Sequence, residues 1–171
     1  MHLIESAMME YMHIFDFDMV HMADYKVEGC TSCHKCKANG HCVLPPSETD
    51  KFQEIFDKMV AADALFIISP VYAGVPSRLV ALLERLTSTL FDSGIMNTER
   101  NPLLNKPTAI FSYCSCGICD ESPIKLLFDK FVMTGYRFDK STYKYLNNTP
   151  DPKHKYNDIT DYVIETLKLL C

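Results

Sequence analysis

Hydrophobic and polar positions change period along the chain, and these changes mark out a series of strands and helices. In residues 14–20, apolar side chains alternate with aspartates, which is the period-two pattern of a strand. Residues 64–69 (ALFIIS) form a continuous apolar run ended by Pro70, which is typical of a strand buried on both faces. Residues 108–113 (TAIFSY) predict a second short buried strand. Residues 136–146, rich in aromatic residues and threonine, predict a straight or bent strand.

Helical periodicity appears between these runs. Ser47 is placed to cap a helix, with Asp50 three residues on, and Pro76 fits the first turn of the next helix. Residues 3–11 and 124–133 favour two further helices. The apolar faces of the three best-defined helices are Phe52, Ile55, Phe56, Met59 and Val60; Leu79, Leu82, Leu83, Leu86 and Leu90; and Val163, Ile164, Leu167 and Leu170.

The alternation of strands and helices predicts an α/β domain, with a parallel sheet covered by helices on both faces. In such sheets, ligands bind beyond the carboxyl ends of the strands. The segments directly after Ser69 and Tyr113 are therefore the first places to expect a site. The 171 residues contain no repeat, low-complexity stretch or linker, and their number is that of one domain.

Composition and charge exclude several classes of protein. Hydrophobic residues make up 47% of the chain and charged residues 23%, so a disordered or collagen-like chain is excluded. The net charge of −5 leaves no basic surface for nucleic acid or an anionic membrane. No apolar run approaches the ~20 residues of a membrane helix, and the N-terminus lacks the basic region of a secretory signal. Together with eight cysteines, this predicts a cytoplasmic protein.

Half of the cysteines form one motif inside a cysteine-rich loop, residues 29–46. Cys30, Cys33, Cys36 and Cys42 follow the spacing C-x2-C-x2-C-x5-C, and Gly40 lets the chain turn back toward the fourth thiol. Ferredoxin-type runs use the same C-x2-C-x2-C core for an iron–sulfur cluster. Zinc sites more often use two separated cysteine pairs. Small buried thiols that pack the loop are the remaining alternative.

Three stretches of the chain resemble the flavodoxin-like NADPH-dependent FMN reductase family, and within it the iron–sulfur flavoprotein branch. They are VEGCTSCHKCKANGHC, ADALFIISPVYAGVPSRLVALLERL and NKPTAIFSYCSCG, of which the second is the most specific. The resemblance covers nearly the whole chain. It implies one FMN-binding domain, residues 1–171, with a doubly wound parallel sheet in a three-layer α/β/α arrangement and FMN at the carboxyl edge.

The resemblance also implies which residues contact the flavin. The loop along the isoalloxazine ring would consist of Ser69, Pro70, Val71, Tyr72, Ala73 and Gly74, and a second flavin loop would include Tyr113, Cys114, Ser115 and Gly117. Proline and glycine keep the first loop narrow, so its backbone N–H groups can reach flavin N5, O4 and N3. Tyr72 either flanks the cofactor or is an ordinary half-buried loop tyrosine. No acid–base catalytic side chain is expected, because the flavin carries the reaction.

The N-terminus departs from the family pattern. The family begins with a short apolar strand and a Ser/Thr-rich loop that holds the FMN phosphate at a helix N-terminus. Residues 1–12 match the end of the family's first helix at best, so the sheet is expected to lack its first, central strand. Three explanations compete: a truncated sequence, which we favour; direct pairing of residues 14–20 with residues 64–69; or a strand supplied by a partner. Truncation predicts weak FMN binding.

Smaller departures concern single side chains. Arg85 matches a family arginine, and we expect a helix-surface charge that serves an oligomer contact. Val80 stands where the family often has lysine. His34 and His41 are expected to be solvent-exposed. The second thiol group, Cys114, Cys116 and Cys119, supplies either a redox-active dithiol or metal ligands beside the flavin, or reduced small residues tolerated in a loop.

The leading hypothesis is an FMN-dependent oxidoreductase with a [4Fe-4S] cluster at the four-cysteine motif. It would pass electrons from NAD(P)H or a ferredoxin-like redox protein to quinone, flavin or oxygen-species acceptors. One alternative is a plain NAD(P)H-dependent flavin or quinone reductase without a cluster. Another is a truncated or degenerate, non-catalytic metal-binding module. The resemblance further implies a homodimer or homotetramer.

Overall fold

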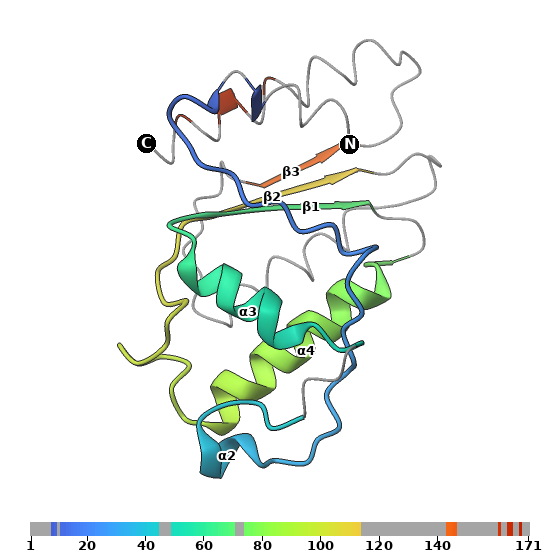
Figure 1. The fold of residues 1–171 in the computed structure, drawn as a ribbon, viewed down its shortest axis with the longest axis vertical. Helices are drawn as coiled ribbons and strands as arrows, with labels where there is room; N and C mark the ends of the chain where they lie inside the picture. The colour runs from blue at the N-terminus through green and yellow to red at the C-terminus, as the bar shows by residue number, and fades with distance from the viewer. Residues whose placement is uncertain are drawn as a thin grey trace.

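The computed structural model describes residues 8–9, 11–44, 49–70 and 74–113, the strand at 143–146, and positions 161, 164, 165 and 168. In chain order the elements are α2 (Cys36–Asn39), α3 (Phe52–Ala61), β1 (Leu65–Pro70), α4 (Ser77–Asp92), β2 (Thr108–Tyr113) and β3 (Tyr143–Leu146). Figure 1 shows α3 and α4 on one side of the strands, with α2 beyond them. Helical positions near both ends of the chain lie on the other side of the strands, as a three-layer arrangement requires.

The sheet is parallel, in the order β1-β2-β3. Leu65 pairs with Thr108 at one end of the β1–β2 ladder and Pro70 with Tyr113 at the other, so the two strands end together. The predicted strand 108–113 is therefore confirmed at both bounds, and the strand 64–69 within one residue. Of the strand predicted over 136–146, the described residues form β3 at its end.

Burial differs between the two predicted buried strands. Every β2 residue from Thr108 to Ser112 is at most 2% exposed, because β2 has a partner on each side and helices against it. In β1 only Ser69 is fully buried, and the preceding residues are half-buried. The prediction of burial on both faces is thus confirmed for β2 and wrong for most of β1, which has one partner among the described strands.

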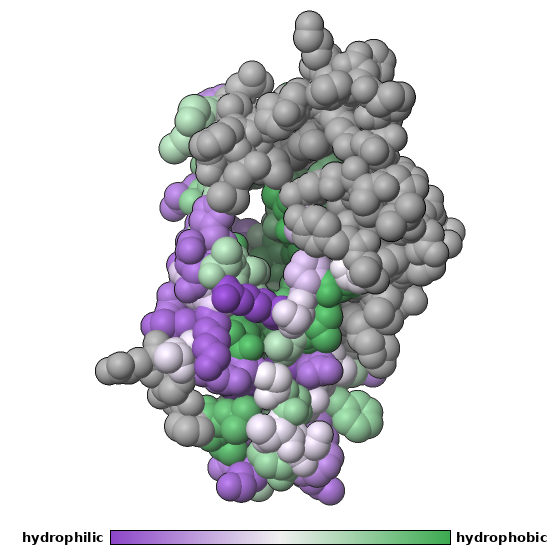
Figure 2. All heavy atoms as spheres, turned by 90° about the vertical axis from the view of Figure 1, so that its right-hand side faces the viewer, coloured by the Kyte–Doolittle hydropathy of each residue, from purple (hydrophilic) through white to green (hydrophobic). Residues whose placement is uncertain are grey.

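The hydrophobic core lies between the sheet and the two longer helices. The predicted leucine face of α4 is confirmed, with all five leucines at most 7% exposed. On α3, Phe52, Ile55 and Met59 are buried, whereas Val60 is 36% exposed, so the predicted face is narrower than expected. Burying a leucine or phenylalanine stabilises a fold by ~1.5–3 kcal/mol, so these two faces fix how α3 and α4 pack. On the face shown in Figure 2, polar side chains surround smaller apolar patches in the described part.

Both predicted helix starts shift along the chain. Helix α3 begins at Phe52 rather than after Ser47, which lies outside the described residues. Asp50 acts as the local cap instead, because its Oδ1 accepts a hydrogen bond of 3.2 Å from the Phe52 N–H. Pro76 directly precedes α4, and its carbonyl accepts hydrogen bonds from the N–H groups of Leu79 and Val80.

The strand predicted over residues 14–20 is wrong. A turn at 12–14 leads into irregular chain there, and the hydrogen-bonded ladder of β1 joins it to β2 instead. Direct pairing of residues 14–20 with 64–69, one of the three explanations offered for the departure at the N-terminus, is therefore also excluded. Phe15 and Phe17 are half-buried with ring centroids 5.8 Å apart, while their neighbours Asp16 and Asp18 are exposed. Alternating burial alone produced the strand pattern, without a hydrogen-bonded ladder.

Other predicted elements are described in part. Met8, Met9 and Tyr11 are helical, in agreement with the short helix predicted over 3–11. Positions 161, 164, 165 and 168 are helical, in agreement with the predicted C-terminal helix. The helix predicted over 124–133 and the thiols of Cys114, Cys116 and Cys119 lie outside the described residues. None of the helices in the described ranges is long and apolar enough to cross a membrane.

Candidate functional site

The carboxyl edge of the sheet brings together the two segments that the sequence singled out. Pro70 and Tyr113 face each other in register, and Tyr113 is paired in turn with Leu146. The chain leaves this edge from β1 toward Gly74 and α4, which begins at Ser77. A helix start offers unpaired backbone N–H groups and the positive end of the helix dipole, which favour an anionic or electron-rich ligand.

Ser69 is held inside the protein rather than presented to a ligand. It is 1% exposed, and its carbonyl accepts a 2.9 Å hydrogen bond from the Ser112 hydroxyl. The Ser69 hydroxyl lies 3.2 Å from the Pro70 carbonyl oxygen. The bond from the Ser112 hydroxyl to the Ser69 carbonyl joins β2 to β1 near their carboxyl ends. Ser69 therefore supports this edge of the sheet through its backbone.

Gly74 lies next to free space. A Cβ atom at this position would meet no atom of the described residues within 4 Å, its chain neighbours aside. Of the residues predicted to contact flavin, Ser69, Pro70, Gly74 and the backbone of Tyr113 belong to the described chain. The remaining ones, Val71, Tyr72, Ala73, Cys114, Ser115 and Gly117, lie outside the described residues.

The four-cysteine motif forms a loop at the opposite end of α4, which we name the thiol loop (residues 30–42). Its four cysteines are free thiols: Cys36 is buried, Cys33 is exposed, and Cys30 and Cys42 are half-buried. Gly40 turns the chain with φ 72°, and its N–H donates to the Cys36 carbonyl at the end of α2. The predicted turning role of Gly40 is therefore confirmed.

Several N–H groups point at the sulfurs of the thiol loop. The Ser32 N–H donates to Cys30 Sγ at 3.4 Å, and the Arg85 Nη2 donates to Cys42 Sγ at 3.3 Å. The pKa of the Cys33 thiol is lowered, chiefly by a hydrogen bond from the Lys35 backbone and further by the Thr31 side chain. Donors of this kind stabilise thiolates, which are the form that binds metals.

Two residues of the thiol loop adopt the left-handed backbone conformation. Ser32 has φ 52° and His34 has φ 55°, in the gaps between consecutive cysteines. This conformation is uncommon for residues other than glycine and clusters at functional sites. Both His34 and His41 are exposed, as expected, and His34 Nδ1 also lies 3.1 Å from Asp92 Oδ2.

Cys36 differs from the other thiols. Burial raises the pKa of the Cys36 thiol, and the Thr89 side chain offsets part of that rise. Among the described residues, no three or more His, Cys, Asp or Glu side chains are gathered closely enough to hold a metal ion. The four thiols of the loop are chemically suited to bind a metal centre as thiolates. Because they are not gathered in this structure, binding would require the sulfurs to move closer together.

One face of α4 lines the inner side of the thiol loop. Arg85, Thr89 and Asp92 follow one another at helical spacing and contact or face Cys42, Cys36 and His34, respectively. A cavity of about 290 Å³ lies beside Cys42. Its walls include Phe52 and Phe56, whose rings stack with centroids 6.0 Å apart.

The expectation that Arg85 is a surface charge is wrong. Arg85 is 2% exposed, and its Nη1 lies 2.5 Å from Oδ2 of Asp50, which is 6% exposed. The guanidinium carbon also lies 4.1 Å from the centroid of the Phe52 ring. A sequence signal for this was present: Arg85 comes three residues after Leu82 and directly before Leu86, at the margin of the apolar face.

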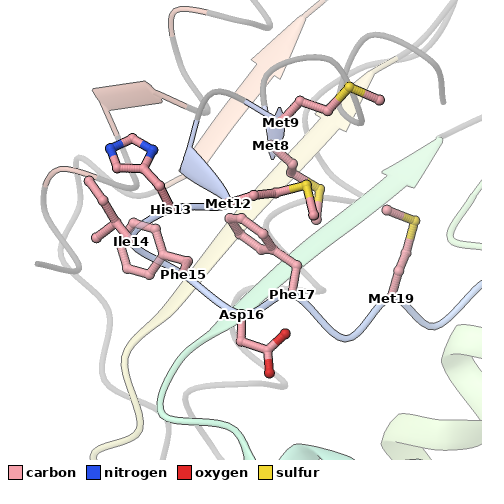
Figure 3. Close-up of a pocket in the computed structure, with 9 residues that line it drawn as sticks. All are labelled: Met8, Met9, Met12, His13, Ile14, Phe15, Asp16, Phe17 and Met19. Atoms are coloured by element: carbon pink, nitrogen blue, oxygen red, sulfur yellow. The ribbon is translucent and has the colours of Figure 1, made fainter.

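A separate hollow of about 540 Å³ lies at the N-terminal segment, away from the predicted site residues. In Figure 3 the side chains of Met8, Met12 and Phe17 converge, whereas His13 points away from them. Met9 and Met12 are more than 60% exposed, at 69% and 67%. Sequence reasoning did not single out this methionine-rich surface.

Comparison with known proteins identifies relatives of this chain. The family model described as NADPH-dependent FMN reductase matches residues 2–119. An iron-sulfur flavoprotein from Methanosarcina thermophila is 36% identical over 72 residues, which are 42% of this chain and 36% of that protein. One from Methanocaldococcus jannaschii is 35% identical over 69 residues, 40% of this chain and 34% of that protein. One from Archaeoglobus fulgidus is 30% identical over 73 residues, 42% of this chain and 31% of that protein. The matches thus span about a third of each relative.

Proposed function

Because the chain belongs to the NADPH-dependent FMN reductase family, with its flavodoxin-like α/β fold, we propose that it is an FMN-binding oxidoreductase. Its electrons would come from NAD(P)H or a ferredoxin-like redox protein and pass to quinone, flavin or oxygen-species acceptors. The observation that carries this proposal is the carboxyl edge, where β1 and β2 end in register beside the start of α4. This is the place where parallel α/β sheets bind their ligands.

The proposed flavin loops are Ser69–Gly74 and the segment from Tyr113 to Gly117. The Ser69 carbonyl already accepts the Ser112 hydroxyl, so contacts to the cofactor would come from backbone groups farther along the first loop. The open space beside Gly74 supports a ring lying against that part of the chain. When bound, FMN supplies the two-electron chemistry, while the protein binds and orients it.

We extend the proposal to an iron–sulfur cluster held by Cys30, Cys33, Cys36 and Cys42. Support comes from the N–H donors aimed at Cys30 and Cys42 and from the names of the similar proteins. A cluster would supply one-electron transfer to complement the two-electron chemistry of FMN. A plain flavin or quinone reductase is the second candidate, favoured by the burial of Cys36 and the raised pKa of its thiol, which are typical of a packing cysteine.

The experiment begins with anaerobic purification, a visible spectrum, and assays of iron, acid-labile sulfide and FMN per chain. Resolved flavin bands with about four irons per chain would support the first candidate. Flavin bands without iron or sulfide would favour the plain reductase. A protein that takes up no FMN, even when FMN is added in excess, would contradict both.

A variant tests the flavin loop directly. Gly74→Val puts a side chain into the open space, so we expect the FMN dissociation constant to rise at least tenfold. The thermal stability of the flavin-free protein should change little, because the added Cβ meets no neighbour among the described residues. Gly29→Val is the matched control, since its Cβ would lie 3.7 Å from Glu84 Oε2, far along the chain from the flavin loops. Equal FMN affinity in Gly74→Val and wild type would refute the loop assignment.

A further inference from the structure

The buried guanidinium of Arg85 touches the thiol loop in an arrangement that a simple structural ion pair does not need. Arginine and a carboxylate usually pair through two parallel hydrogen bonds. Here only Nη1 contacts Asp50, at 2.5 Å, and it also lies 3.5 Å from the Glu28 carbonyl. The second arm of the fork, Nη2, is turned to Cys42 Sγ at 3.3 Å.

Other contacts hold the Arg85 guanidinium in this orientation. The Phe52 ring supports the guanidinium at 4.1 Å, and both charged partners are almost fully buried. Arg85 Nε is also buried, and no hydrogen-bond partner for it is found in the described part of the chain. A bidentate pair with Asp50 would give the guanidinium two strong hydrogen bonds to a carboxylate. In the observed geometry one of these bonds is replaced by the contact between Nη2 and Cys42 Sγ.

We propose that Arg85 is a positioning residue for the thiol loop, which anchors Cys42 and holds a positive charge beside its sulfur when the loop binds a metal centre. The inference rests on the proposed metal-binding role of the four cysteines. Asp50 fixes the guanidinium, the guanidinium fixes Cys42, and hydrogen bonds to ligand sulfurs tune a cluster's reduction potential.

Along helix α4, Arg85 is well separated from the proposed flavin site, so its role at the thiol loop can be tested apart from flavin binding. Arg85 lies eight residues after Ser77, the start of α4, which corresponds to ~12 Å along a helix axis. A change at Arg85 should therefore leave FMN binding unchanged, and FMN content serves as an internal control.

The test uses Arg85→Lys, which keeps the positive charge and can reach Asp50 but cannot serve Asp50 and Cys42 together with a planar fork. Arg78→Lys is the matched control, because Arg78 is an exposed arginine on the same helix that donates to the Met22 carbonyl. Each protein is reconstituted anaerobically with iron and sulfide, and the iron content and the cluster's midpoint potential are measured. The metal-free proteins are also titrated with Co²⁺ alone, following thiolate-to-metal absorption.

For Arg85→Lys we expect at least a twofold loss of iron per chain and a more negative midpoint potential, because Cys42 Sγ loses the hydrogen bond from Nη2 and such bonds to ligand sulfurs stabilise the reduced cluster. The Co²⁺ dissociation constant should rise 10- to 100-fold, as is usual when a residue that orients a metal ligand is changed. Arg78→Lys should match wild type in all three measurements, and all three proteins should bind FMN equally.

Wild-type iron content, potential and Co²⁺ affinity in Arg85→Lys would overturn the proposal while leaving the proposed function intact. A wild-type protein that binds Co²⁺ but builds no cluster would refute the cluster, and the Co²⁺ titration would still decide the role of Arg85. A thiol loop that binds neither would overturn the proposal. If Arg85→Lys does not fold, Asp50→Glu takes its place: it keeps the ion pair but displaces the guanidinium, and unchanged metal binding there would equally overturn the proposal.

Discussion

The buried pair of Asp50 and Arg85 should be a major determinant of stability. In the Asp50→Asn variant, the amide oxygen can still accept the N–H groups of Phe52 and Glu28, which lie 3.2 and 3.4 Å from Asp50 Oδ1. The charge that balances Arg85 is lost, however, and the guanidinium stays buried at 2% exposure. Removing one partner of a buried ion pair typically costs about 3–5 kcal/mol.

Because the backbone contacts of Asp50 survive in this variant, we expect a loss near the lower end, about 3 kcal/mol. For a chain of this size, that corresponds to a fall in melting temperature of roughly 6–12 °C. The assay is urea and thermal denaturation of the metal-free, flavin-free protein, followed by far-UV circular dichroism.

Three further variants make the reasoning testable: Asp57→Asn, Arg85→Met, and the double variant Asp50→Asn with Arg85→Met. Asp57→Asn is the control, because Asp57 is an exposed residue of α3, the helix that follows Asp50 in the chain, and accepts a hydrogen bond from Gln53; the stability loss in this variant should stay within ~0.5 kcal/mol. The double variant Asp50→Asn with Arg85→Met removes both charges, so its loss should be smaller than the sum of the two single losses by at least ~1 kcal/mol. A loss below ~1 kcal/mol in Asp50→Asn, or strict additivity in the double variant, would refute the argument.

Two other predictions concern single side chains. Among the four cysteines of the thiol loop in the metal-free protein, iodoacetamide should label Cys33 first and Cys36 last, because Cys33 is exposed with a lowered thiol pKa and Cys36 is buried with a raised one; timed mass spectrometry measures the order, and equal rates would contradict the described loop. Burial lowers the pKa of the Lys106 amine, so between that lowered pKa and the ordinary value of 10.5 the unfolded chain binds more protons than the folded one. Stability should therefore rise with pH across this window, and more steeply in wild type than in Lys106→Met; denaturant titrations at several pH values give the two slopes, and equal slopes would exclude this role for Lys106.

Much of the fold was predictable because its signals are local. The apolar run at β2 gives both ends of that strand, and the leucine periodicity of α4 gives its buried face. Proline and aspartate near the helix starts indicated where α3 and α4 begin, though the actual starts differ by a few residues. The carboxyl edge, as the place to expect a ligand, followed from the alternation of strands and helices, since parallel strands must end at one side of the sheet.

The thiol loop was predictable as a motif but not as a geometry. The spacing of the cysteines is visible in the sequence, and so is the turn at Gly40. Which thiol is buried and which exposed depends on how α2 packs against α4, a contact between segments about fifty residues apart. Period-two burial misled the prediction for residues 14–20, because an unpaired extended segment can bury alternate side chains as a strand does.

The sequence by itself determined the parallel α/β architecture, the strands β1 and β2, the leucine face of α4 and the four-cysteine motif, because each rests on a pattern of residues that are near one another in the chain. Only the tertiary structure decided that Arg85 is buried against Asp50 and turned toward Cys42. The ion pair joins residues 35 positions apart, and the contact with sulfur joins residues 43 positions apart. A charged residue beside an apolar face can point to solvent or into the core, and the choice depends on a partner that local periodicity does not reveal.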